Sequence, residues 1–179
     1  MELRKDAEEI IQGAIGAALP DAAVRRAMEQ CPLGEGKVVL VSVGKAAWQM
    51  AKAAADLLGE RISAGVVVTK YGHSMGPVSN FEIIEAGHPV PDENSFRGAE
   101  AAIRLVSGLA PEDLVLFLVS GGGSALFEKP LVSPEELTDI TQQLLACGAD
   151  IVEINTIRKR ISAVKGGKFG QLCAPARVF

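Results

Sequence analysis

Aromatic residues and basic charge are both scarce in this chain. Of its 179 residues only 4% are aromatic, and the 22 acidic residues outnumber the 18 basic ones, which gives a net charge of −4. Domains that bind nucleic acids usually carry a basic balance, and those that bind single strands stack the bases on aromatic side chains. The composition therefore argues against a nucleic-acid partner.

Paired cysteines and long apolar runs are also missing. Cys31, Cys147 and Cys173 are far apart and form no CxxC pair, which is typical of reduced thiols in a cytoplasmic protein. Neither His73 nor His88 has a cysteine nearby, so the sequence contains no metal-binding pattern. Because no apolar run approaches about 20 residues, we expect no membrane span. The charged N-terminal residues do not resemble a signal peptide, and we expect a cytoplasmic protein.

Short apolar runs that end at glycine alternate with helical patterns along the chain. Residues 37–43 read as a buried strand, Gly44 and Lys45 as a turn, and 46–58 as an alanine-rich helix. Further strands are expected at 62–70, 81–86, 113–119 and 176–179, and further helices at 2–18, 20–30, 95–108, 133–146 and 150–161. This alternation predicts a single α/β domain with a mainly parallel sheet.

The strand predicted at 113–119 ends at Ser120-Gly121-Gly122-Gly123-Ser124. Three glycines leave the backbone N–H groups unobstructed, and such groups bind anions, most often phosphate. A tight strand-to-helix turn is the alternative, but a single turn does not need three glycines. We therefore interpret residues 120–124, called the glycine loop below, as the floor of an anion site.

Other glycine motifs do not fit the sequence. The dinucleotide fingerprint GxGxxG needs glycine or alanine at position 126, and the nucleophile elbow GxSxG needs glycine there, but the residue is Leu126. A P-loop ending at Lys45 would need glycine at position 39 and serine or threonine at 46, where Val39 and Ala46 stand. Protein-kinase HRD and DFG sequences are absent.

Cationic residues follow several of the predicted strands. Lys45 lies in the first βα turn, at the edge where open α/β sheets bind ligands, although a solvated lysine at a helix start is the alternative. His73 and His88 each follow a strand, and residues 165–170 form a second glycine-rich loop, which is basic. Anion-binding and cationic groups without metal ligands suit phosphoryl transfer, in which positioning and charge stabilisation do most of the catalysis.

Four motifs together closely resemble the glycerate 2-kinase family, whose bacterial members were long labelled hydroxypyruvate reductase. They are Val-Gly-Lys-Ala-Ala at 43–47, Gly-His-Pro-Val-Pro-Asp at 87–92, Ser-Gly-Gly-Gly-Ser-Ala-Leu at 120–126, and Ile-Asn-Thr-Ile-Arg-Lys-Arg-Ile-Ser-Ala-Val-Lys-Gly-Gly-Lys at 154–168. The motifs cover most of the chain from about residue 37 onward.

The resemblance implies two α/β domains, of which residues 1–179 are similar to the N-terminal one, a Rossmann-like three-layer domain with helices on both faces of the sheet. It implies transfer of the γ-phosphoryl group of ATP, with Mg²⁺, to the 2-hydroxyl of D-glycerate in the cleft between the domains. A possible homodimer is also expected.

The resemblance also assigns roles to single residues. Lys45 matches a lysine that is considered catalytically important, and the glycine loop matches one that lines the cleft. His88, Asn155, Arg158 and Lys165 lie in matching motifs and are candidate substrate- or phosphate-binding residues.

Family members are much longer than this chain, and Ala176–Phe179 look like the start of a further strand. We therefore expect a fragment that lacks the second domain, and an isolated chain that folds at least in part but has little or no kinase activity. Two alternatives stay open. One is an NAD(P)H-dependent hydroxypyruvate reductase, which Leu126 argues against, and the other is a non-catalytic module that binds a sugar phosphate or another anion.

Overall fold

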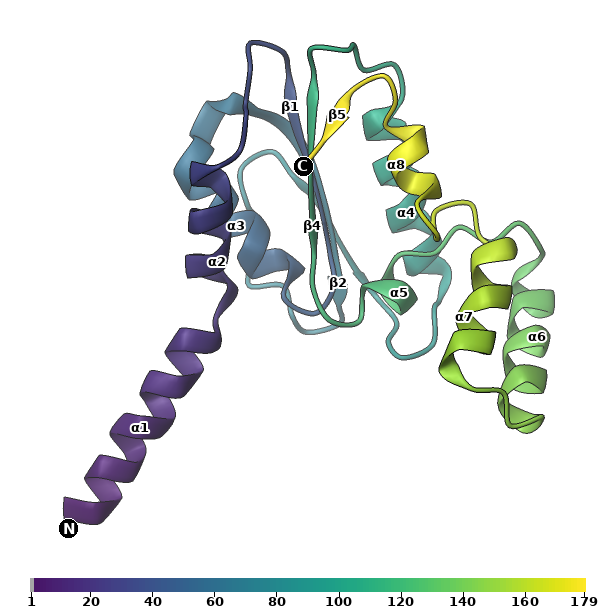
Figure 1. Cartoon of the computed structure of the whole chain (residues 1–179), viewed down its shortest axis with the longest axis horizontal. Coiled ribbons are helices and arrows are strands. Elements are labelled where there is room, and N and C mark those ends of the chain that lie inside the picture. Colours follow the sequence, from purple (N-terminus) through teal and green to yellow (C-terminus); the bar gives the residue numbers. More distant parts are fainter. Residues whose placement is uncertain (1) are drawn as a thin grey trace.

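The computed structural model describes residues 2–179 and is built on one five-stranded sheet (Figure 1). Its strands are β1 (Val38–Val43), β2 (Ile62–Lys70), β3 (Glu82–Ala86), β4 (Leu114–Val119) and β5 (Arg177–Val178). All neighbouring strands pair in parallel, in the order β3-β2-β1-β4-β5. The direction in which strands are added reverses between β1 and β4, which is the topological switch point of a Rossmann-like fold.

Strands β1 and β4 form the centre of the sheet. Every residue of β1 is buried, and Leu114–Leu116 of β4 are buried as well. Helices cover both faces, so both strands are nearly continuous apolar runs rather than alternating ones. The two strands pair without a register shift, from Val38 opposite Leu114 to Val43 opposite Val119. Their carboxyl ends therefore lie side by side.

Helices pack on both faces of the sheet, and each face has its own apolar cluster (Figure 1). One face carries α2 (Pro20–Glu29) and α3 (Ala47–Leu58), and the other carries α4 (Glu93–Val106), α5 (Gly123–Leu126) and α8 (Lys168–Leu172). A short 3₁₀ turn, η1 (Gly59–Arg61), leads into β2. The predicted α/β class, with a parallel sheet between two helical layers, is confirmed.

Capping boxes mark where three of the helices begin. The side chains of Asp92, Ser133 and Asp150 accept hydrogen bonds from the first turns of α4, α6 (Pro134–Ala146) and α7 (Ile151–Arg160). Because Asp92 is the cap, α4 begins two residues earlier than the sequence pattern predicted. The expected loop at 165–170 is also shorter, since α8 begins at Lys168.

Two helical segments stand away from the sheet (Figure 1). Helix α1 (Glu2–Ala18) projects from α2, and the α6–α7 hairpin projects from the opposite side. Helix α1 is amphipathic as predicted, but its large apolar side chains, Leu3, Ile10, Ile11 and Ile15, are all exposed. No helix in residues 2–179 combines the length and the apolar character needed to cross a membrane.

The buried centre of the sheet gives the first testable prediction. Leu116 in β4 is fully buried, whereas Leu3 in α1 is 86% exposed. We expect Leu116→Ala to lower the free energy of unfolding by about 2–5 kcal/mol, because it leaves a cavity in a packed core. The control Leu3→Ala should stay within about 0.5 kcal/mol of the wild type. Urea denaturation measures both, and equal effects would contradict the burial described here.

Candidate active site at the switch point

The turns that follow β1 and β4 are hydrogen-bonded to each other. The N–H of Lys45 donates to the carbonyl of Gly121 at 2.8 Å, and the N–H of Ala46 donates to Ser120 Oγ at 3.1 Å. The N–H of Ser120 returns a bond of 2.9 Å to the carbonyl of Val43, which also accepts from the Ser120 hydroxyl. The hydroxyl of Ser120 is therefore engaged in hydrogen bonds within the protein, and its part in ligand binding stays a prediction.

Two glycines permit this close approach. Gly44 has a φ of +121° and Gly122 a φ of +89°, conformations that residues with a Cβ rarely adopt. A Cβ on Gly44 would lie 2.2 Å from Ser120 Oγ. On Gly122 it would lie 2.9 Å from Nε2 of His88 and 3.3 Å from Cγ of Lys45. Lys45 and His88, which follow different strands, thus both lie against the middle of the glycine loop.

The glycine loop presents main-chain donors that the protein does not use. The N–H groups of Ala125 and Leu126 donate to the carbonyl of Gly122. Within residues 2–179, no oxygen accepts a hydrogen bond from the N–H of Gly121, Gly122 or Ser124. Gly121 and Ser124 are exposed. Such donors, with the exposed Lys45 beside them, are suited to an anion.

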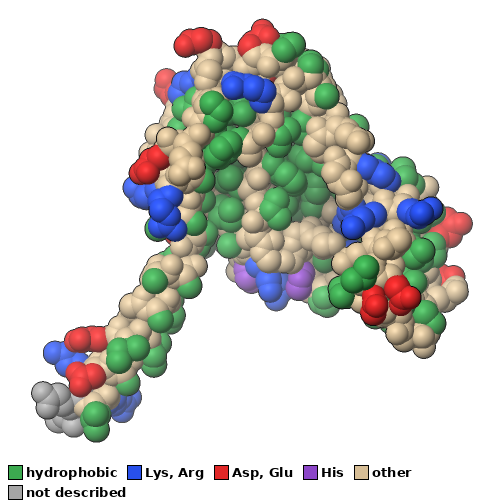
Figure 2. Space-filling model, in the orientation of Figure 1, with side chains coloured by type: hydrophobic (Ala, Val, Ile, Leu, Met, Phe, Trp, Pro, Cys, Tyr) green, Lys and Arg blue, Asp and Glu red, His purple; other side chains and the backbone are tan. Residues whose placement is uncertain are grey.

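Both histidines lie at the same edge of the sheet as the glycine loop. Nδ1 of His73 lies 2.9 Å from the carbonyl oxygen of Lys45, and His88 is half-buried against Gly122. Figure 2 shows histidine side chains on both sides of a basic side chain at the lower rim of the molecule, below the ends of the strands. His73 and His88 each follow a strand, as predicted, and the loops after β2 and β3 therefore both reach this edge.

Lys165 and Arg158 lie behind the glycine loop, on the side of its carbonyl groups. Nζ of Lys165 donates to the carbonyls of Ser124 at 2.6 Å and Phe127 at 2.9 Å, and it lies 2.9 Å from Oε2 of Glu128. Arg158 donates to the carbonyl of Ser124 at 3.2 Å. Burial lowers the pKa of Lys165, and the Glu128 carboxylate opposes that shift. Both cations hold the main chain of the loop.

The remaining sequence candidate, Asn155, is half-buried on α7, and its side chain forms no hydrogen bond with any of residues 2–179. Glu128 was missed by the sequence analysis. The only local sequence feature that sets Glu128 apart is that an acidic residue directly follows the apolar run Ala125–Phe127, which is buried in the structure. No spacing rule relates that residue to Lys165, because the two meet only through the tertiary fold.

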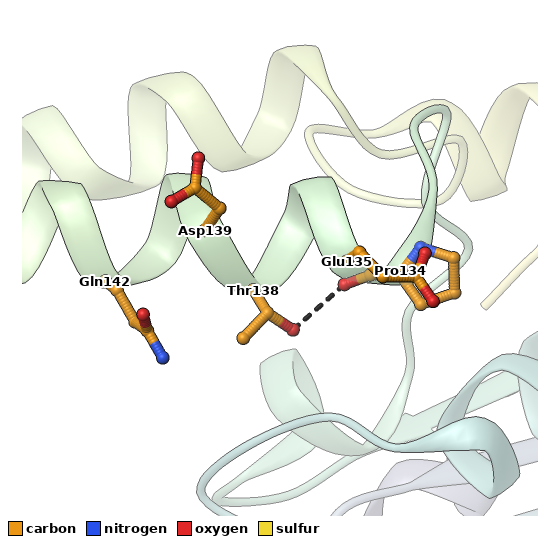
Figure 3. Close-up of a pocket in the computed structure, with 5 residues that line it drawn as sticks. All are labelled: Pro134, Glu135, Thr138, Asp139 and Gln142. Atoms are coloured by element: carbon orange, nitrogen blue, oxygen red, sulfur yellow. Dashed lines mark hydrogen bonds between the residues drawn. The ribbon is translucent and has the colours of Figure 1, made fainter.

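Two further features bear on where a ligand could bind, namely metal-binding side chains and surface hollows. In residues 2–179, no three His, Cys, Asp or Glu side chains gather in a way that could hold a metal ion. A hollow of about 420 Å³ is lined by Pro134, Glu135, Thr138, Asp139 and Gln142 (Figure 3). All five residues belong to α6, where the Thr138 hydroxyl donates to the carbonyl of Pro134, and none is a predicted site residue.

The fold and the site together define an α/β protein in which a lysine, a histidine and unused main-chain N–H groups meet at the switch point of a parallel sheet. The chain belongs to the family described as Domain of unknown function (DUF4147), whose profile matches residues 6–179.

Relatives from this family carry informative names. D-glycerate 2-kinase of Thermotoga maritima is 54% identical over 178 residues, which are 98% of this chain and 42% of that protein. Glycerate 2-kinase of Pyrococcus horikoshii is 48% identical over 140 residues, which are 77% of this chain and 31% of that protein. A crystal structure of Thermotoga maritima glycerate kinase matches 99% of this chain and 43% of its own length with a TM-score of 0.91. The resemblance to glycerate 2-kinases is confirmed, and the chain spans less than half the length of these relatives.

Gly122 provides a test of the site that leaves the sheet intact. We expect Gly122→Val to weaken binding of inorganic pyrophosphate by at least about tenfold, because a side chain there displaces His88 and Lys45. Gly108→Val is the matched control, since Gly108 also has a positive φ (+78°) but no atom lies near its missing Cβ. Isothermal titration calorimetry measures both variants. Equal losses of affinity would show that backbone strain, and not the site, is responsible.

Proposed function

We propose that this chain forms the anion-binding wall of a glycerate 2-kinase, which transfers the γ-phosphoryl group of ATP to the 2-hydroxyl of D-glycerate. The observation that carries the proposal is that Lys45, His88 and the unused N–H groups of the glycine loop meet at the switch point. The names of the relatives support the same reaction. We assign the opposite wall to the part of those proteins that this chain does not match, as a second domain.

Each group at the site has a definite chemical capacity. ATP, when bound, supplies the phosphoryl group. The exposed ammonium group of Lys45 can stabilise negative charge that develops on phosphoryl oxygens, which is the main requirement of this reaction. The N–H groups of Gly121, Gly122 and Ser124 can hold an anion in a fixed position, and Nε2 of His88 lies close enough to Gly122 to contact the same anion. That anion is either a phosphate of the nucleotide or the carboxylate of glycerate.

The proposed reaction also uses Mg²⁺. Mg²⁺ binds oxygen ligands, usually one or two carboxylates together with phosphates and water. No acidic group of three side chains is found in residues 2–179, so the residues present do not form a complete cage.

The other functions considered for the sequence have less support. A dinucleotide fingerprint would place a small residue where Leu126 is fully buried against the core. A module that binds an anion without turnover uses the same glycine loop and differs from the kinase only in its lack of reaction. A homodimer stays a prediction.

A chimera tests the kinase proposal directly. The matched 178 residues of the Thermotoga maritima relative can be replaced by this chain, because the two are 54% identical and superpose with a TM-score of 0.91. We expect the chimera to form ADP from ATP only when D-glycerate is present. Lys45→Met should lower its kcat by roughly 100-fold or more, because one stabilising cation is lost at the reacting centre. The control Lys52→Met, on an exposed part of α3, should change kcat less than about twofold.

The outcomes separate the competing functions. The isolated 179-residue chain should bind ATP or pyrophosphate without forming ADP. Oxidation of NADH by hydroxypyruvate would favour the reductase. A chimera that turns over glycerate equally well with and without Lys45 would refute the role given to that residue.

A further inference from the structure

Glu128 is a buried carboxylate behind the glycine loop that the proposed reaction does not use. Its side chain is 1% exposed, with Oε2 at 2.9 Å from Nζ of Lys165 and 4.0 Å from a guanidinium nitrogen of Arg158. Its other oxygen, Oε1, is buried and has no hydrogen-bond partner in residues 2–179. A buried ion pair whose hydrogen bonds are incomplete is a poor source of stability, and apolar residues of similar volume are often as good or better.

The two cations connect Glu128 to the main chain of the loop. Lys165 donates to the carbonyls of Ser124 and Phe127, and Arg158 donates to that of Ser124. Peptide groups are planar, so holding the carbonyl of Ser124 also fixes the N–H of Ala125, which donates to the carbonyl of Gly122. Glycines impose little conformational restriction of their own. Gly121 and Gly122, whose N–H groups are unused, therefore depend on contacts outside the loop to keep those groups aimed in one direction.

We propose that Glu128 is a positioning residue for the anion site: its buried carboxylate holds Lys165 and Arg158 against the carbonyls at the exit of the glycine loop, and so fixes the N–H groups at its entrance. The inference rests on the proposed function in one respect, because it takes the glycine loop to be the anion site. Lys165 and Arg158 then act from behind the loop and do not contact the ligand.

The charge of Glu128 is what keeps Lys165 in place. The Lys165 side chain is only 12% exposed, and burial disfavours its charged form. Without the carboxylate, the ammonium group either turns toward water or gives up its proton. In both cases its hydrogen bonds to the Ser124 and Phe127 carbonyls are lost or weakened.

The test uses three variants of the 179-residue chain. Glu128→Gln keeps the shape of the side chain and removes its charge, and Lys165→Met removes the cation. Glu100→Gln is the matched control, because Glu100 is also paired with a lysine, Lys129, but its side chain is 42% exposed. Two quantities are measured: the Kd for inorganic pyrophosphate, and the ¹⁵N order parameters of residues 121–124 without any anion.

Glu128→Gln and Lys165→Met should each weaken pyrophosphate binding about tenfold. In both, the order parameters of the loop should fall from roughly 0.85 toward 0.6 or below, while Glu100→Gln resembles the wild type. Tighter binding by Glu128→Gln would overturn the proposal, because it would mean that Lys165 contacts the anion itself. A lower Tm with unchanged affinity and order parameters would also overturn it, since the role of Glu128 would then be structural only.

A double variant, Glu128→Met with Lys165→Met, covers the case in which a single variant does not fold. Two apolar side chains should restore the Tm, but the loop should stay mobile and bind pyrophosphate weakly. Recovery of both Tm and affinity would contradict the proposal. If the wild-type chain does not bind pyrophosphate, the anion-site assignment fails, and the order parameters alone then decide whether Glu128 positions the loop.

Discussion

The hydrogen bonds between the turn after β1 and the turn after β4 determine the arrangement of the whole site. Lys45 and Ala46 donate to Gly121 and Ser120, and Ser120 donates back to Val43. These bonds form because β1 and β4 pair in register to their last residues, and because Gly44 has no side chain in the way. The position of Lys45 relative to the glycine loop is therefore fixed by the backbone of the sheet and not by mobile side chains.

Around this junction, charge is distributed on two sides of one loop. Lys45 and His88 lie on the side of the unused N–H groups, where an incoming anion would be bound. Lys165 and Arg158 lie on the side of the carbonyls and are balanced by Glu128. The loop itself contributes almost no side-chain bulk, so its conformation depends on both sets of contacts. In the proposed division of roles, Lys45 takes part in the reaction and Lys165 supports the architecture of the loop.

The sequence predicted most of the fold because the relevant signals are local. Apolar runs ending at glycine located the strands, and helical patterns located most of the helices. Lys45 was also placed correctly, since the turn after a strand fixes its edge of the sheet. The contacts of Glu128 and the internal use of the Ser120 hydroxyl were not predictable in this way. They join residues 30–37 and 74–77 positions apart, and no periodic pattern encodes which side chain such a residue will meet.

The most direct test of the account is a ¹⁵N–¹H NMR titration of the 179-residue chain with inorganic pyrophosphate. The account predicts that the amide resonances of Lys45, Gly121, Gly122 and Ser124 shift together, with a single Kd, while those of α6 do not move. Shifts that are absent from the glycine loop, or that are centred on the hollow beside α6, would contradict the central claim that the switch point is an anion site.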